Sequence, residues 1–124
     1  MMPKRLARLN EQLKREVSEL VRRKVRDPRV GPVTITSIEV AGDLGSARVY
    51  VRPQNPNDEL SESLAGLEAA APFLRRELGR SLHLRRVPEL RFQQDHSLDQ
   101  ARRIEEILSD VLSPVLDEDE ENLE

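Results

Sequence analysis

Hydrophobic residues recur at helical spacing over the first part of the chain and predict a helix from about Pro3 to Arg26. Its apolar face is built from residues three or four positions apart, namely Leu6, Leu9, Leu13, Val17, Leu20 and Val21. Asp27-Pro28 ends this helix, because proline disfavours helical geometry in the residue before it.

A row of cationic side chains lies opposite that apolar face. At about 100° per residue, one side of the helix carries five of them, which we call the basic stripe: Lys4, Arg8, Arg15, Arg22 and Arg26. Such a row is either a solvated helix face or a surface for a polyanion. Glu11 and Glu19 border the stripe and dilute its charge.

Two short segments rich in β-branched residues predict a hairpin. They are Val33–Ala41 and Ser46–Arg52, and they flank a loop with glycine at both ends. In the second segment apolar and polar residues alternate, so one face of the hairpin is buried and the other is wet. The first segment changes phase near Ser37, which predicts either a β-bulge or a strand covered on both faces.

The stretch 63–84 has the pattern of one long amphipathic helix, but Pro72 interrupts it. An interior proline removes a backbone donor and clashes with the carbonyl four residues earlier, at a cost of roughly 3 kcal/mol or more. We therefore predict two helices that meet at a bend over residues 70–72, since proline suits the first turn of a new helix. After the bend, Arg76 and Arg80 lie opposite the second apolar face.

The remaining pattern predicts a third strand from Glu89 to Asp95 and a last helix that begins with a capping box at Ser97. The apolar face of that helix is formed by Ile104, Ile107, Leu108, Val111 and Leu112. The predicted fold class is α+β, in α-β-β-α-bend-α-β order with an added C-terminal helix. Helices that cover a three-stranded sheet would form a sandwich.

Composition and charge divide the chain into a basic body and an acidic end. A chain of 124 residues suits a single domain. Its net charge is −3, but six acids fall in the last eight residues, and without them 20 basic residues face 17 acidic ones. We predict a mildly basic domain over 1–116 and a disordered acidic tail over 117–124. Basic residues concentrate in 1–29 and 75–91, which indicates a polyanionic partner.

Metal, membrane and catalytic signals are weak in this sequence. The chain has no cysteine and two isolated histidines, and its apolar runs are far too short to span a bilayer, so we expect a cytoplasmic protein without a cofactor. Asp95-His96-Ser97 contains the residue types of a catalytic triad, but neighbours on an extended strand point to opposite faces. There is no phosphate-binding loop motif. We predict no enzymatic activity.

Several strings in this order and spacing resemble the bacterial ribosome-binding factor A family. They are D-P-R (27–29), V-T-I-T (33–36), D-L-x-x-A-x-V-Y-V (43–51), F-L-R-R-E-L-G (73–79), L-R-R-V-P-E-L-R-F (84–92) and D-x-S (95–97). The resemblance implies a type II KH-like domain. The family has an Ala-x-Gly bend between two helices, and here Ala70 matches it while Pro72 stands in place of the glycine.

The resemblance also implies a function. Members of this family are non-catalytic assembly factors that bind the free small (30S) ribosomal subunit and assist late maturation of 16S rRNA. The small subunit and its rRNA are the implied partners, together with ribosomal proteins and maturation GTPases, and a monomer active in cold adaptation is implied as well. The alternative is a protein-interaction module whose basic helices dock an acidic partner without touching RNA.

We expect the RNA-binding residues at two places, the basic stripe and the bend. The second set, which we call the bend surface, comprises Ala70, Ala71, Pro72, Phe73, Leu74, Arg75, Arg76, Arg80, Arg85 and Arg86. If a new helix starts at Pro72, the amides of Phe73 and Leu74 have no helical partners and attract phosphate. The lack of stacking aromatics favours recognition of folded RNA by its shape.

Overall fold

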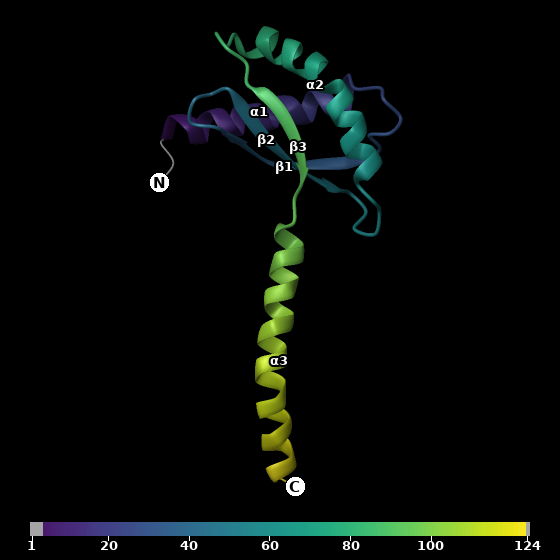
Figure 1. The fold of residues 1–124 in the computed structure, drawn as a ribbon, viewed down its shortest axis with the longest axis vertical. Coiled ribbons are helices and arrows are strands. Elements are labelled where there is room, and N and C mark those ends of the chain that lie inside the picture. Colours follow the sequence, from purple (N-terminus) through teal and green to yellow (C-terminus); the bar gives the residue numbers. More distant parts are fainter. Residues whose placement is uncertain (1–3, 124) are drawn as a thin grey trace.

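The structure, a computed structural model, describes residues 4–123, and it describes side chains over 4–112. Three helices and one three-stranded sheet alternate along the chain (Figure 1). In chain order they are α1 (Lys4–Arg23), β1 (Val33–Val40), β2 (Ser46–Pro53), α2 (Ser61–Leu82), β3 (Glu89–Gln94) and α3 (Ser97–Leu123). The α+β class predicted from the sequence is confirmed.

The sheet has the order β1-β2-β3, and its two pairings differ in direction. β1 pairs with β2 antiparallel, and β2 pairs with β3 parallel. The parallel pairing follows from the chain path, because a crossover through α2 returns the chain to the end of the sheet from which β2 starts. The register of β1 shifts between Ile35 and Ser37, which confirms the predicted bulge.

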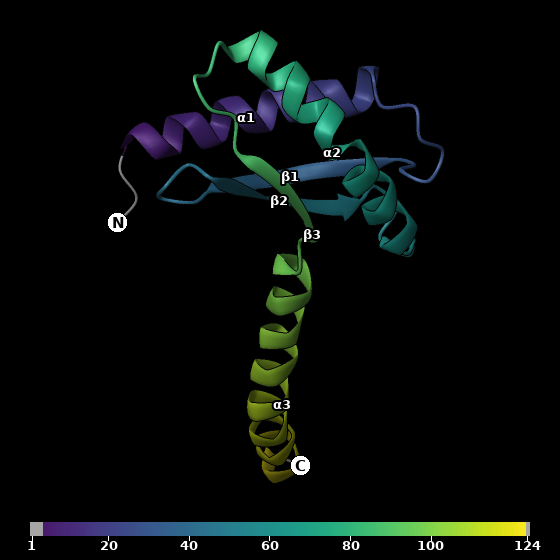
Figure 2. The same ribbon diagram turned by 45° about the horizontal axis from the view of Figure 1, so that its top comes forward.

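One face of the sheet is covered by helices and the other is open. In β2, Ala47, Val49 and Val51 are at most 1% exposed, whereas their neighbours Arg48 and Tyr50 point to the other side. Figure 2 shows α1 and α2 together on one side of the sheet. The alternation predicted for this strand is therefore confirmed.

α1 packs its leucine and valine face against the sheet and is tied to β1 by a buried amide. Leu13 and Val17 are fully buried, and the Val40 amide donates a 3.0 Å hydrogen bond to Asn10 Oδ1. α1 ends at Arg23, three residues before the predicted end. The amides of Lys24 and Val25 both donate to the Leu20 carbonyl, so the last turn loosens before Asp27-Pro28 is reached.

α2 lies across β3 and closes the aliphatic core. Leu67, Leu74 and Leu78 are fully buried beneath it. β3 is an edge strand, and its Phe92 amide donates a 3.1 Å hydrogen bond to Glu68 Oε1 of α2. This side chain takes the place of a neighbouring strand at that position and leaves less of the edge unpaired.

α3 does not cover the sheet, so α1 and α2 alone form the predicted sandwich with it. In Figures 1 and 2 the helix leaves the end of β3 and projects away from the body on the open side of the sheet. Every described side chain of α3, from Ser97 to Leu112, is exposed. The helix continues to Leu123, into the acidic end of the chain, and the boundary between 116 and 117 stays a prediction.

Gly66 gives a test of the packing between α2 and the segment before β1. A Cβ at this buried position would lie 2.8 Å from Val30 Cγ2 and 3.2 Å from the Val30 backbone nitrogen. Alanine normally stabilises a helix interior by about 1 kcal/mol relative to glycine, but the overlap with a stiff valine reverses the sign. We expect Gly66→Ala to lower the free energy of unfolding by about 1–3 kcal/mol in denaturant titrations.

The matched control for that substitution is Gly42→Ala in the hairpin loop. A Cβ at Gly42 meets no atom within 4 Å, so the free energy of unfolding should change by less than about 0.5 kcal/mol. Equal stability of the two variants would contradict the close contact between Gly66 and Val30.

Candidate nucleic-acid interface

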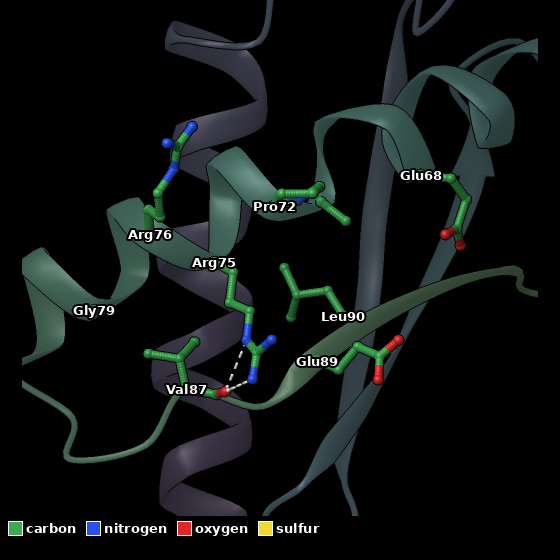
Figure 3. A pocket seen from close by; sticks show the side chains of 9 residues that line it. Glu68, Pro72, Arg75, Arg76, Gly79, Val87, Glu89 and Leu90 are labelled. Carbon is green, nitrogen blue, oxygen red and sulfur yellow. Dashed lines mark hydrogen bonds between the residues drawn. The ribbon is translucent and has the colours of Figure 1, made fainter.

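α2 is one continuous helix with Pro72 inside it, and this corrects the prediction of two separate helices. Figure 3 shows the ribbon changing direction at Pro72. A proline in a helix displaces the carbonyl four residues earlier and kinks the axis. Leu67, Leu74 and Leu78 nevertheless keep one helical phase on both sides of the kink, and all three are fully buried.

The continuous helix also changes the roles of Phe73 and Leu74. Both lie in the interior of α2, so no new helix N-terminus with unpaired amides exists at the bend. The Leu74 side chain is fully buried, and Phe73 is partly buried against the core. The predicted phosphate contact through these two amides is therefore wrong. Pro72 is exposed, and Ala70 and Ala71 are half-buried.

A cleft of about 820 Å³ lies beside the kink, between α2 and the start of β3 (Figure 3). It is lined by Glu68, Ala71, Pro72, Arg75, Arg76, Gly79, Val87, Glu89 and Leu90. The arginines lie on the part of α2 that follows Pro72, and the carboxylates are Glu68 before the kink and Glu89 of β3, so positive charge concentrates on the second arm of α2 and not throughout the cleft. An anion would be held along that arm.

Arg75 and Arg76 are neighbours in sequence but have different surroundings. Arg75 Nε and Nη2 donate hydrogen bonds of 3.0 and 2.9 Å to the Val87 carbonyl, which fasten α2 to the segment before β3. Arg76 points away from Val87 in Figure 3 and has no ion pair with any described acid. Arg75 is therefore held in a structural contact, whereas the Arg76 guanidinium is free to bind a ligand.

The other arginines of the bend surface are exposed. Arg80 Nη1 lies 3.7 Å from Glu77 Oε1, a loose contact between a side chain that is 80% exposed and one that is 16% exposed. Arg85 and Arg86 follow the end of α2, where His83 adopts a left-handed conformation with φ of 50°. Neither forms an ion pair among the residues whose side chains are described. These arginines extend the positive surface from the kink to the end of α2.

The basic stripe meets the bend surface only at its C-terminal end. A shallow groove of about 230 Å³ brings Arg26 beside Ala70 and Phe73. Arg22 donates 2.8 Å hydrogen bonds to both Glu19 carboxylate oxygens, and this contact lowers the pKa of Glu19. Arg22 is therefore partly neutralised.

The rest of the stripe runs away from the kink. Lys4, Arg8 and Arg15 are exposed along α1. A helix rises 1.5 Å per residue, so the start of α1 is about 30 Å from its end. The stripe and the bend surface form one continuous site only near Arg26.

Asp27 and Arg29, from the D-P-R string, form a closed ion pair. Arg29 Nη2 lies 2.7 Å from Asp27 Oδ2, and the Arg29 amide donates a 2.9 Å hydrogen bond to Asp27 Oδ1. These hydrogen bonds lower the pKa of Asp27 to about 2. The pair shapes the turn after α1 and leaves Arg29 with its charge compensated.

Two side chains outside the predicted site hold its elements together. Lys24 Nζ lies 3.2 Å from Glu77 Oε2 and joins the end of α1 to α2. Glu68 joins α2 to β3 through the Phe92 amide. Neither pair was predicted, because the partners lie far apart in sequence and no local pattern marks them.

Ser97 is the first residue of α3 and not its N-cap, and the Asp95 carboxylate accepts a hydrogen bond from the first amide of the helix. The Ser97 amide donates a 2.8 Å hydrogen bond to Asp95 Oδ1. Hydrogen bonds from Thr36 and Ser97 lower the pKa of Asp95. The carboxylate therefore acts as a helix cap, which accounts for its place beside His96 without catalysis.

No other binding chemistry appears in the described part of the chain. Among those residues, no three histidines, cysteines or carboxylates gather as metal ligands. Within the same residues, no helix combines the length and hydropathy that a membrane span requires. Exposed arginines near the kink are the chemistry that this surface offers.

Residues 5–108 match the family model for ribosome-binding factor A. The chain belongs to the ribosome-binding factor A family. A relative of that name from Desulfitobacterium hafniense is 44% identical over 104 residues, covering 84% of this chain and 83% of the relative. The family match ends within α3, and so includes the whole body and the first part of that helix.

Solved structures of the family share this fold. The crystal structure of ribosome-binding factor A from Thermus thermophilus is 30% identical, with a TM-score of 0.64, and the match covers 72% of this chain and 94% of that one. A homology model of the T. thermophilus protein, fitted into the cryo-EM map of a 30S complex, is also 30% identical, with a TM-score of 0.60. That match covers 73% of this chain and 96% of the other.

The contrast between Arg75 and Arg76 leads to a test of stability in this family member. Arg75→Ala removes both hydrogen bonds to the Val87 carbonyl and should lower the free energy of unfolding by about 1–2 kcal/mol. Arg76→Ala, the matched control on the same turn, should change it by less than about 0.5 kcal/mol. Denaturant unfolding of both variants measures the difference, and equal losses would show that Arg75 does not fasten the two elements.

The Asp27–Arg29 pair makes stability depend on pH in a defined window. The pKa of Asp27 is about 2 in the folded chain against 3.8 for a free carboxyl, so its contribution is present above about pH 4. That contribution is lost as the pH falls from about 4 to 2. We expect Asp27→Asn to make the unfolding midpoint depend less on pH between pH 5 and pH 2. A profile unaltered by Asp27→Asn would contradict the pair.

Proposed function

We propose that this chain binds the small (30S) ribosomal subunit through 16S rRNA, with the bend surface and the adjoining end of α1 as its contact. The observation that carries the proposal is the group of exposed, uncompensated arginines from the kink of α2 to just beyond its end. Arg76, Arg85 and Arg86 belong to it, and Arg26 joins it across the groove beside Ala70. The fitted position of the T. thermophilus relative in a 30S complex supports the small subunit as the partner.

The body acts in this proposal as a type II KH-like domain. The element order and the parallel β2–β3 pair support that assignment, and kinked α2 takes the place of the two helices around a KH loop. Pro72 stands where the family has a flexible glycine, so the angle between the two arms is held by the proline ring and by buried leucines. The surface is then presented to RNA in one geometry.

Recognition in this proposal is by phosphate position and not by base stacking. The chain has three aromatic residues, Tyr50, Phe73 and Phe92. Phe92 is 6% exposed, Phe73 packs on the core, and Tyr50 lies on the open face of the sheet, away from the bend surface. Arginines that hold phosphates fix orientation on a folded RNA without reading its sequence.

The role that follows is that of a non-catalytic assembly factor in the cytoplasm. A domain that binds rRNA by its shape stabilises one conformation of the subunit and disfavours others, because it shifts the equilibrium by its difference in affinity. Late maturation of 16S rRNA is a process in which such a shift has an effect. No bond needs to be made or broken by this chain.

Charge reversal tests this surface directly. We expect Arg76→Glu with Arg80→Glu to lower the affinity for free small subunits by about 10–100-fold. The salt dependence of binding should also decrease, because a protein that makes fewer phosphate contacts releases fewer counterions when it binds. Co-sedimentation with purified subunits over a range of KCl concentrations measures both quantities. Arg80 retains only a loose contact with Glu77, so the fold should persist.

The matched control is Arg102→Glu with Arg103→Glu on exposed α3. It changes the net charge by the same amount at a distance from the bend surface. Affinity unchanged by the Arg76 and Arg80 reversal, or lowered equally by the control, would refute the bend surface as the contact. Crosslinking of the chain to rRNA would distinguish the proposal from a protein-only interaction, which yields no RNA adduct.

A further inference from the structure

α3 presents an apolar stripe that nothing in the described chain covers. We define the α3 stripe as Ile104, Ile107, Leu108, Val111 and Leu112, whose side chains are 54 to 63% exposed. The first four follow the i, i+3, i+4, i+7 spacing of an amphipathic helix that lies in a hydrophobic groove of a partner. In proteins, most of the stability of a helix comes from packing of its amphipathic face.

The segment that carries this stripe has a net charge opposite to that of the body. Residues 97–124 hold ten acids against two arginines, a net charge of −8, whereas residues 1–96 hold 18 basic against 13 acidic residues, a net charge of +5. The division falls where α3 leaves the sheet. A surface that binds RNA and a surface that repels it are thus joined in one chain.

The charge of this segment and the polar face of the sheet disfavour the nearest alternative partners of the α3 stripe. The net charge of −8 on residues 97–124 repels the phosphates of RNA, and a second copy of α3 would bring the same charge against the first. The open face of the chain's own sheet carries Arg48, Tyr50 and Arg52, and so lacks the apolar side chains that the stripe would need.

We propose that α3 docks into an apolar groove with basic edges on a protein of the small subunit, while the body binds RNA. This inference rests on the proposed function and names a second, protein class of partner for it. α3 projects from the open side of the sheet, so its stripe reaches away from the bend surface (Figure 2). Two linked contacts of different chemistry raise the overall affinity, because the second forms at high effective concentration.

The test compares intact subunits with their RNA alone. We expect Ile104→Ser with Leu108→Ser in the full chain to lower the affinity for purified small subunits roughly tenfold, as loss of two anchors in a groove does. Affinity for protein-free 16S rRNA should stay unchanged. Arg102→Ser with Glu106→Ser, on the opposite side of α3, is the matched control. It also introduces two serines, and it should alter neither affinity. Circular dichroism would check that both variants keep equal helix content.

Other outcomes would overturn the inference in distinguishable ways. An equal loss on protein-free rRNA would mean that RNA covers the α3 stripe, and no loss on either would mean that the stripe makes no contact. A dimer of the free chain that dissociates on the Ile104 and Leu108 substitutions would assign the stripe to a second copy. Failure of the unsubstituted chain to bind subunits would instead refute the proposed function.

A photo-crosslinking residue at position 108 gives an independent measurement on the same subunits. The inference expects an adduct with a ribosomal protein from position 108, and an rRNA adduct when the same residue replaces Arg76. An rRNA adduct from position 108 would contradict the protein groove.

Discussion

The burial of leucines on both arms of one kinked helix is the constraint on which the rest of this structure depends. Leu67 precedes Pro72, Leu74 and Leu78 follow it, and all three are fully buried. Burying each stabilises the fold by roughly 1.5–3 kcal/mol, so together they exceed the roughly 3 kcal/mol that an interior proline costs. The helix therefore continues through the proline and bends, since separating the arms would expose part of the core.

The kink decides which arginines remain available. Consecutive residues of a helix point about 100° apart, so with Arg75 turned toward the Val87 carbonyl, Arg76 is turned toward solvent. Arg75 and Glu68 attach α2 to β3, and Lys24 attaches α1 to Glu77 of α2. These contacts hold the two arms of α2 against the sheet, and the exposed arginines are held in position with them.

The division of charge between the body and α3 follows from where the core ends. Two helices suffice to cover the inner face of the three-stranded sheet, and the outer face is polar at Arg48, Tyr50 and Arg52. Among the described residues of the body, Leu44 is the one large apolar side chain that is exposed, so the body offers α3 little apolar surface to cover. The helix therefore projects from the body with its apolar stripe exposed.

The sequence by itself determined the parts of this protein that depend on local periodicity. The α1 face, the bulge near Ser37, the alternation in β2 and the family strings were all visible because each is a pattern among near neighbours. Leu67, Leu74 and Leu78 fall on one face of a single helix that runs through Pro72, and this spacing was a signal for one continuous helix. The prediction gave more weight to the local cost of the proline.

Only the tertiary structure decided the rest, because it depends on what lies far away in the sequence. Arg75 is held in a structural contact and Arg76 is free because the Val87 carbonyl lies beside Arg75. The meeting of Arg26 with Ala70 depends on how α1 crosses α2. The exposure of α3 depends on a sheet face that offers it no apolar contact. An amphipathic pattern shows that a helix has an apolar side, but it does not show what will cover that side.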